Sequence, residues 1–268
     1  FKHHNAQPCW ALCFARFTAW RLYVSNVGYP ILRLVLQSSI PRSARSFDMK
    51  EGLVIAIPAR LGASRLPGKP LLMVAGKPLI GHVIECGLRF AGAEVVVATD
   101  DARIAAIAAD YSVAAVLTSS DHATGSDRLA EVARRMAWND RTIVVNLQGD
   151  EPLMPLTCLE AVVAALQADS HAHAATLATP IAHSCEAFDP SCVKVVCDRA
   201  GRALYFSRAP VPWSRDDWAR DRFAMPAQPM LRHLGLYAYR ASTLRAFAEL
   251  PRSPLEVVES LEQRSEEH

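Results

Sequence analysis

Three short apolar runs, separated by segments of helical periodicity, constrain the fold of this chain more than any other feature. The runs are Leu53–Pro58, Glu94–Thr99 and Thr142–Leu147. Their apolar interiors are typical of strands that are covered on both faces of a sheet. Strands that alternate with helices favour βαβ units with right-handed crossovers. We therefore expect an α/β fold with a Rossmann-like, doubly wound, mostly parallel sheet.

The middle of the chain has a different character. Val193–Cys197 and Ala203–Ser207 flank Asp198–Gly201, a sequence that favours a hairpin turn. Prolines and the charged stretch Ser214–Arg222 follow. We expect a β-rich insertion or lid over about 190–235. The remaining predicted elements are a short strand at Ala114–Leu117, a return strand at Leu234–Tyr239 and helices at 79–89, 102–110, 126–135, 156–168, 243–250 and 255–263.

Residues 1–48 differ from the rest, because they are rich in Trp, Phe, His and Arg and lack any strand–helix alternation. An Arg-rich, nearly acid-free composition superficially resembles an organelle transit peptide. A secretory signal is disfavoured, since no apolar segment lies between a basic start and a small-residue cleavage site. Upstream sequence ahead of a start at Met49 is the favoured interpretation. We expect 1–48 to be an extension outside the fold and 49–268 to form one domain.

Charge and composition exclude several classes of function. Of the 29 basic and 27 acidic residues, six and one respectively lie in 1–48, so the remainder carries a net charge of about −3. This gives no whole-domain electrostatic case for binding nucleic acid. No apolar run is long enough to span a bilayer. The seven cysteines are scattered, without a Cys-x-x-Cys pair, which favours a reduced, cytoplasmic protein.

The loop after the first predicted strand, Pro58–Lys69, is the first candidate site. Ligands in a doubly wound sheet bind beyond the carboxyl ends of the strands. Glycines allow close approach to phosphates, and cations complement a polyphosphate. The loop matches neither Walker A nor G-x-G-x-x-G, and a solvated basic loop is the alternative. Its position favours anion binding. Its glycines and cations are Gly62, Gly68, Arg60, Arg65 and Lys69.

The strongest acidic site is Gln148–Pro152, which follows the third predicted strand. A carboxylate at this strand end, Asp150, would lie opposite the cationic loop. Mg²⁺ prefers few carboxylates together with phosphate oxygens and water. Gly149 would let the turn approach a nucleotide. A charged turn is the alternative, and the complementarity of position and charge favours a metal site.

Two smaller motifs leave their alternatives open. Thr99-Asp100-Asp101 ends the second predicted strand, where the acidic pair would either touch a ligand or cap the next helix. In His122–Arg128, Gly125 and Ser126 can present amides and a hydroxyl, although capping alone would explain Ser126. The pair Asp127 and Arg128 can also be a solvated ion pair.

The later segments offer candidates for an acidic substrate. Arg208 can pair with a carboxylate. His233 alone is more often structural. Glu256 and Glu259 lie near the start of a predicted helix, where acidic residues are favourable whatever the function.

Together, the motifs resemble a known family. IPARLGASRLPGKPL resembles the signature loop of nucleotide-sugar pyrophosphorylases, and most closely that of the 3-deoxy-manno-octulosonate cytidylyltransferase (CMP-Kdo synthetase) family. The pattern R-x-x-x-S-R-L-P-G-K is met from Arg60 to Lys69, and the TGSDR and QGDEP motifs are also matched. The resemblance extends from about Met49 to Gln263 and implies a fold of the nucleotide-diphospho-sugar transferase type.

The resemblance implies the reaction of CTP with a 3-deoxy-2-ulosonic acid to give CMP-Kdo and pyrophosphate, for lipopolysaccharide biosynthesis in the cytoplasm. It also implies a homodimer when the carboxyl-terminal part is complete. The implied catalytic residues are Arg60, Arg65, Lys69 and Asp150, with Asp150 as the Mg²⁺ ligand. The implied nucleotide-binding residues are Ala59, Gly62, Ser64, Gly68, Thr99, Asp100, Gly125, Ser126, Asp127, Arg128, Gln148 and Gly149. The implied sugar-acid residues are Arg208, His233, Tyr237 and Glu256.

The sequence also departs from the family's pattern. Val257 replaces a polar residue expected beside Glu256. The family continues beyond Leu261-Glu262-Gln263 with a strand and an acidic segment that carries a second metal-binding carboxylate, whereas this sequence ends at His268. We therefore expect weak or no turnover from the chain as given. The alternatives are a cytidylyltransferase for another sugar acid, such as sialic acid, or a shortened, non-catalytic CTP-binding protein.

Overall fold

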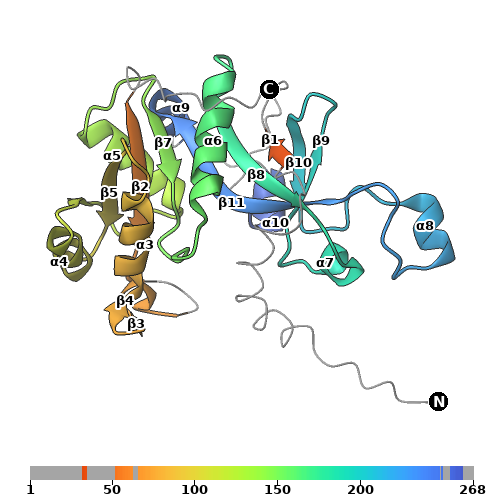
Figure 1. Cartoon of the computed structure of the whole chain (residues 1–268), viewed down its shortest axis with the longest axis horizontal. Helices are drawn as coiled ribbons and strands as arrows, with labels where there is room; N and C mark the ends of the chain where they lie inside the picture. The colour runs from red at the N-terminus through yellow and green to blue at the C-terminus, as the bar shows by residue number, and fades with distance from the viewer. Residues whose placement is uncertain (1–31, 35–51, 63–65, 248, 250–253, 262–268) are drawn as a thin grey trace.

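The structure, a computed structural model, describes residues 32–34, 52–62, 66–247, 249 and 254–261. Its main sheet has the strand order β1-β8-β11-β7-β2-β5-β6, and a hairpin of β9 and β10 joins it through β11 (Figure 1). These strands are β1 (Leu32–Leu34), β2 (Leu53–Ala59), β5 (Glu94–Thr99), β6 (Ala114–Leu117), β7 (Ile143–Asn146), β8 (Ala174–Pro180), β9 (Lys194–Cys197), β10 (Ala203–Ser207) and β11 (Leu231–Arg240).

One half of the sheet is parallel and covered on both faces. β2 pairs in parallel with β5 and β7, and β5 pairs in parallel with β6. Ile55 and Ile57 point toward a cluster that includes α3, α4 and α6, whereas Val54 and Ala56 point toward α5 and α9. The predicted doubly wound α/β fold is confirmed. The helices are α3 (Leu79–Leu88), α4 (Ala102–Asp110), α5 (Gly125–Arg135), α6 (Leu156–Ala168) and α9 (Ala241–Phe247).

The other half of the sheet is antiparallel and is organised by β11. This strand pairs antiparallel with β7, β8 and β9, and β9 forms the predicted hairpin with β10. The return strand was therefore predicted at the right place but is longer than expected. β8, between α6 and α7 (Ser184–Phe188), was not predicted; its Ala- and Thr-rich sequence lacks the strong apolar run that marked the others.

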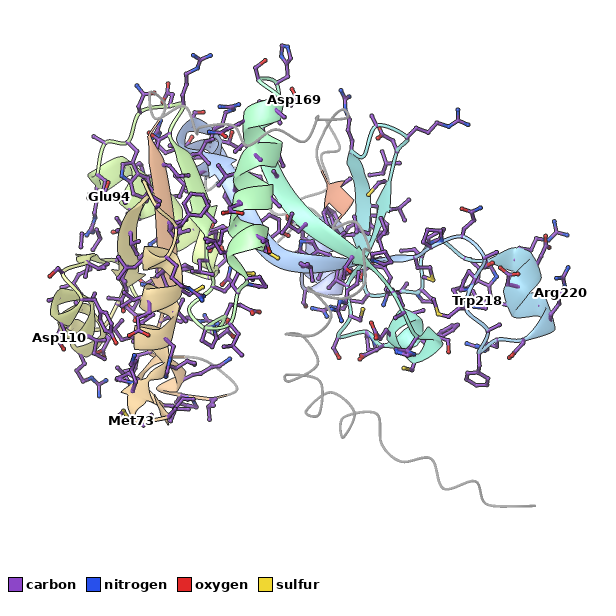
Figure 2. The ribbon with its side chains drawn as sticks, viewed as in Figure 1. Met73, Glu94, Asp110, Asp169, Trp218 and Arg220 are labelled. Carbon is purple, nitrogen blue, oxygen red and sulfur yellow. The ribbon has the colours of Figure 1, made fainter. Side chains whose placement is uncertain are left out.

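The segment between β10 and β11 forms an arm that projects from the body of the molecule and carries α8 (Arg215–Arg220) (Figure 1). Trp218 is buried there in a small cluster with Ile181, Ala187, Cys192 and Met230. Figure 2 places Trp218 and Arg220 on this arm, far from Met73 in the hairpin of β3 (Met73–Val74) and β4 (Lys77–Pro78). The charged stretch predicted as part of a lid therefore contains a helix.

The predicted extension, 1–48, lies almost entirely outside the described residues. Its described part, β1, pairs antiparallel with β8, where Leu32 lies opposite Ala178. The domain boundaries proposed from the sequence stay a prediction. In the described part of the chain, none of the helices combines the length and apolar character needed to cross a membrane.

Candidate functional site

The two loops that the sequence singled out meet at the carboxyl ends of β2 and β7. A Cβ atom on Gly149 would lie 2.8 Å from the carbonyl oxygen of Pro58 and 3.4 Å from Cβ of Ala59. Such a short distance to a backbone atom leaves room only for glycine. Across the same junction, Nζ of Lys69 lies 2.7 Å from Oδ2 of Asp150. The predicted phosphate-binding cation and the predicted metal-binding carboxylate are therefore in direct contact.

The loop after β2 closes on itself before the next element begins. The amide of Gly68 donates to the carbonyl of Leu61 over 2.9 Å. Gly68 has φ of 73°, a left-handed conformation that favours glycine, and a 3-10 turn at Lys69–Leu71 follows it. Arg60 and Gly62 are exposed at the start of the loop. Ser64 and Arg65, which the sequence predicted as ligands, lie outside the described residues.

Beneath this loop lies a buried ion pair. The amide of Leu61 donates to Oδ1 of Asp100 over 3.1 Å, and the other carboxylate oxygen accepts from Nη2 of Arg128 over 3.1 Å. Arg128 is 2% exposed and also donates to Oγ1 of Thr118. Arg128 therefore pairs with Asp100, which corrects the alternative of a solvated pair with Asp127. Asp100 and Arg128 hold the loop from below.

Thr99 is also part of this foundation. Its side chain is fully buried, and its hydroxyl accepts from the amide of Asp101 over 3.2 Å. Asp101 caps α4 by accepting from the amide of Arg103 over 2.9 Å. For Asp101, the capping alternative is therefore confirmed.

The start of α5 joins the same edge of the sheet. Thr124 caps the helix, since its hydroxyl accepts from the amide of Asp127 over 3.1 Å. This corrects the prediction that Ser126 is the cap; Ser126 lies in the first turn. A Cβ atom on Gly125 would lie 3.2 Å from Cγ of Pro58 and 3.7 Å from Oε1 of Gln148. Gly125 and Gln148 therefore lie beside the loop, and their role as nucleotide ligands stays a prediction.

The acidic turn after β7 has a perturbed electrostatic environment. Loss of solvation raises the pKa of Glu151 above its ordinary value, repulsion from Asp150 adds to this, and Lys69 opposes it. Negative charge is therefore concentrated at this turn, with Lys69 as the cation that compensates it. Two adjacent carboxyl groups with this character are able to hold a divalent cation.

Arg208, the predicted partner of a substrate carboxylate, binds the chain itself in this structure. Its Nε donates to the carbonyl of Glu259 over 2.6 Å, Nη1 to that of Pro190 over 2.8 Å and Nη2 to that of Ser260 over 3.2 Å. The guanidinium therefore fastens the end of α10 (Pro254–Glu259) to the antiparallel half of the sheet. Its role toward a substrate stays a prediction that requires these contacts to open.

Glu259 is the acidic residue that connects this region, and sequence reasoning gave it no functional role. Its carboxylate accepts from the Tyr205 hydroxyl over 2.9 Å, the Ser207 hydroxyl over 2.7 Å and the Arg208 amide over 2.5 Å. Burial raises the pKa of Glu259, but these hydrogen bonds outweigh it and lower the pKa below the ordinary value. Glu256, the residue predicted for the sugar acid, is buried at 6% exposure.

Lys194 is a second residue that the sequence did not single out. It is completely buried, and its Nζ donates to the carbonyls of Asp189 over 2.9 Å and Arg208 over 2.7 Å. Burial lowers its pKa. Its apolar neighbours in β9 gave no signal that a cation is buried there.

His233 and Tyr237, predicted as sugar-acid residues, lie side by side on β11 with ring centroids 5.2 Å apart. His233 is 8% exposed, and its Nε2 lies 2.9 Å from Oγ1 of Thr176. Burial lowers the pKa of His233 to about 3, so its imidazole is neutral at physiological pH. Tyr237 lies opposite Asn146, and Asn146 accepts from Nε2 of Gln148 over 3.2 Å. A row of polar side chains thus connects the two predicted halves of the site.

Comparison with known proteins gives consistent matches. The family model described as Cytidylyltransferase matches residues 54–265. A 3-deoxy-manno-octulosonate cytidylyltransferase of Methylococcus capsulatus is 55% identical over 216 residues, which cover 80% of this chain and 84% of that protein. One of Halorhodospira halophila is 54% identical over 210 residues, covering 78% of this chain and 82% of that protein.

Solved structures agree with these matches. A CMP:2-keto-3-deoxy-manno-octonic acid synthetase complexed with CTP has a TM-score of 0.70 and 43% identity, covering 79% of this chain and 83% of that one. A 4-diphosphocytidyl-2C-methyl-D-erythritol synthase has a TM-score of 0.50 and 13% identity, covering 81% and 87% respectively, and shows the shared fold alone.

Proposed function

The chain belongs to the 3-deoxy-manno-octulosonate cytidylyltransferase family, and we propose that it joins CTP to 3-deoxy-manno-octulosonate (Kdo) to give CMP-Kdo and pyrophosphate. The observation that carries the proposal is the contact of Lys69 with Asp150, which brings the cationic loop and the acidic turn together. The glycine at position 149 is what permits this approach.

In the proposed reaction, the anomeric hydroxyl of the sugar acid attacks the α-phosphorus of CTP. One P–O bond forms to the sugar oxygen, the bond to the departing pyrophosphate breaks, and the hydroxyl proton is released to the solvent. Positioning and neutralisation of charge account for most of the catalysis in such a step. Arg60, Arg65 and Lys69 supply positive charge to the triphosphate, and the buried pair of Asp100 and Arg128 holds the loop that carries them.

We also propose that the enzyme uses Mg²⁺, with Asp150 as its protein ligand. The residues fit this ion, because Asp150 is half exposed at a strand end and Glu151 lies next to it. Among the described residues, no group of three or more His, Cys, Asp or Glu side chains could hold a metal by itself. That agrees with an ion held mainly by phosphate oxygens and water. Bound Mg²⁺ would neutralise charge on the phosphates.

Two further parts of the proposal concern location and assembly. The described cysteines are unpaired, and burial raises the pKa of Cys158, Cys192 and Cys197 to about 11, which supports a cytoplasmic protein with unreactive thiols.

Trp213 and Phe223 on the projecting arm are 56% and 78% exposed, and exposed aromatic residues are enriched at subunit interfaces. This supports a homodimer, which sedimentation velocity would test.

Pyrophosphate release with CTP, Kdo and Mg²⁺ tests the proposed reaction. The assay compares this chain with a version extended beyond residue 263 by the segment that the family pattern places there. We expect release by the extended version and CTP binding, measured by calorimetry, by both. Asp150→Asn should reduce release by roughly 100-fold or more, whereas Asp101→Asn should not.

Each alternative has its own outcome in the same experiment. Release with sialic acid and CTP but not with Kdo would assign a different sugar acid. CTP binding by both versions without release from any sugar acid would indicate a non-catalytic CTP-binding protein. Absence of both binding and release would reject the proposed function.

A further inference from the structure

Thr176 stands at an irregularity in the pairing of β8 with β11. The register of these strands shifts between Leu234 and Tyr237 of β11. The hydroxyl oxygen of Thr176 lies 3.2 Å from the carbonyl oxygen of Leu234 and 2.9 Å from that of Leu236. It also lies 2.9 Å from Nε2 of His233. Thr176 is 6% exposed, so water does not easily replace these contacts.

The number of protons available in this cluster determines which nitrogen of His233 carries hydrogen. A hydroxyl has one proton to donate, and a backbone carbonyl can only accept. If the Thr176 hydroxyl donated to His233, both carbonyl oxygens would face its oxygen with no proton between them. In the consistent arrangement, the Thr176 hydroxyl donates to the carbonyls of Leu234 and Leu236 and accepts from Nε2–H of His233. The neutral ring then has its lone pair on Nδ1.

Nδ1 of His233 is therefore an acceptor in a largely buried side chain. In the part of the chain that the structure describes, no hydrogen bond to Nδ1 is present. The ring is flanked by the rings of Phe206, at 5.0 Å, and Tyr237, at 5.2 Å. Among the described residues, this nitrogen is not one of the buried side-chain atoms that lack a partner, so it lies at the exposed part of the ring, where a ligand that donates can reach it. Burial also keeps the ring from gaining a proton, so Nδ1 remains an acceptor.

We propose that Thr176 is a positioning residue that holds His233 as the Nε2–H tautomer, so that Nδ1 accepts a hydrogen bond from a hydroxyl group of the sugar acid. The inference rests on the proposed function for the identity of the ligand. It gives His233 the task of recognising a hydroxyl group, which a neutral ring can do, instead of the carboxylate, which needs a positive charge or several donors. Thr176 does not touch the substrate and acts only through the ring.

Nitrogen NMR of the full chain labelled with ¹⁵N-histidine tests the tautomer directly, with His233→Gln used to assign the signal. We expect a pyrrole-type Nε2 and a pyridine-type Nδ1 in the wild type between pH 6 and 8. Addition of Kdo in the presence of CTP should shift the Nδ1 signal. A pyrrole-type Nδ1 in the wild type would overturn the inference.

A matched pair of variants tests the role of the hydroxyl. Thr176→Ser keeps the hydroxyl and should preserve both the tautomer and the Kd for Kdo to within about twofold. Thr176→Val has nearly the same shape without the hydroxyl; it should give a mixture of tautomers and raise the Kd for Kdo roughly 5- to 30-fold, with the Kd for CTP unchanged. Equal Kd values for Kdo in the two variants, or equal losses for Kdo and CTP in Thr176→Val, would contradict the proposal.

His233→Gln provides a second test that does not disturb the bulge. Its amide can still donate toward Thr176 but lacks the acceptor at the position of Nδ1, so Kdo binding should weaken while CTP binding and thermal stability are retained. Unchanged Kdo binding would overturn the inference. Pyrophosphate release from CTP and Kdo together with an Nδ1 signal that Kdo leaves unshifted would also overturn it, although the proposed function would stand. Failure of CTP binding and of pyrophosphate release would reject the proposed function, and the tautomer measurement would still decide the role of Thr176.

Discussion

The two ends of the predicted site use charge in opposite ways. At the nucleotide end, the Lys69 and Asp150 side chains are 37% and 50% exposed and bind each other. At the sugar-acid end, Lys194 is fully buried, and both it and Arg208 donate to backbone carbonyls. Exposed ions can exchange one partner for another at little cost, whereas buried ions are held by the groups that compensate them. Charges at the first end are thus available to a ligand, and those at the second maintain the architecture.

The proposed recognition of the sugar acid relies on neutral groups. His233 is buried and uncharged, and it lies beside Tyr237. The nucleotide end also contains a buried ion pair, Asp100 with Arg128, which lies beneath the loop. Its exposed ion pair is Lys69 with Asp150. Substitutions should therefore affect stability strongly at the buried charges and ligand binding selectively at the exposed ones.

The largest loss of stability is expected from Asp100→Asn. This change leaves the guanidinium of Arg128 buried without its acidic partner, which should cost about 3–5 kcal/mol in the free energy of unfolding. Urea denaturation measures this loss. Asp101→Asn is the matched control: asparagine still caps α4, so its loss should remain below about 1 kcal/mol. Equal losses in the two variants would mean that the buried pair of Asp100 and Arg128 does not stabilise the protein more than the exposed Asp101 does.

At the sugar-acid end, Glu259→Gln should lower the free energy of unfolding by about 2–3 kcal/mol. The carboxylate accepts three hydrogen bonds, and the amide replaces one acceptor oxygen by a donor that would face other donors. The exposed Glu160 in α6 is the control, since Glu160→Gln should have almost no effect. An unchanged free energy of unfolding in Glu259→Gln would mean that these three hydrogen bonds make no net contribution to stability.

The buried, neutral His233 predicts a dependence of stability on pH. Its pKa is lowered from 6.5 to about 3 in the folded state, so the unfolded chain binds a proton that the folded chain does not. Its contribution to stability is therefore present above the unfolded pKa and is lost as the pH falls below it. Between pH 7 and pH 5 the wild type should lose about 2 kcal/mol more than His233→Gln does. Parallel losses in both proteins would show that His233 is protonated in the folded state.

Gly149→Ala tests the contact between the two loops of the nucleotide end. The added Cβ would lie 2.8 Å from a backbone oxygen, which should cost about 1–2 kcal/mol and displace Asp150 from Lys69. CTP affinity should fall together with stability. Gly62→Ala is the control for stability, because nothing lies within 4 Å of its added Cβ and its backbone does not require glycine. A full-affinity Gly149→Ala protein would contradict the proposed junction.

The smallest effect on stability is expected from Lys69→Met, because an exposed ion pair contributes less than about 1 kcal/mol. CTP affinity, measured by calorimetry, should nevertheless fall roughly 10- to 100-fold, since a charge-assisted contact to the triphosphate is lost. Lys77→Met removes a comparable surface pair with Glu85 and should leave CTP affinity unchanged. Similar CTP affinities in the two variants would indicate that the exposed pair is not part of the nucleotide site.

The sequence predicted those features that depend on local pattern. The apolar runs identified β2, β5 and β7, and the turn residues identified the hairpin of β9 and β10. The glycine and charge patterns identified the loops that meet at Gly149. These signals are local because burial on both faces of a sheet and tight turns each constrain consecutive residues.

The features that the sequence did not reveal depend on partners far apart in the chain. Arg208 looked available for a substrate, but its guanidinium binds carbonyls that come from α10 and from the segment before β9. Glu259 lies 51 residues from the Arg208 amide that it accepts from. The cap of α5 was misplaced from Thr124 to Ser126 because either hydroxyl suits that position until the backbone geometry is known.

The length of β11 has a consequence for how two substrates can meet. This single strand carries His233 at one end and, through Tyr237–Arg240, pairs with β7 below the nucleotide loops. Both His233 and the segment that pairs with β7 belong to this one strand, so its backbone fixes how far apart the two predicted halves of the site lie. A movement of one half relative to the other would have to break backbone hydrogen bonds between β11 and its neighbouring strands. The spacing between the two predicted halves of the site is therefore set when the protein folds, and ligand binding does not have to establish it.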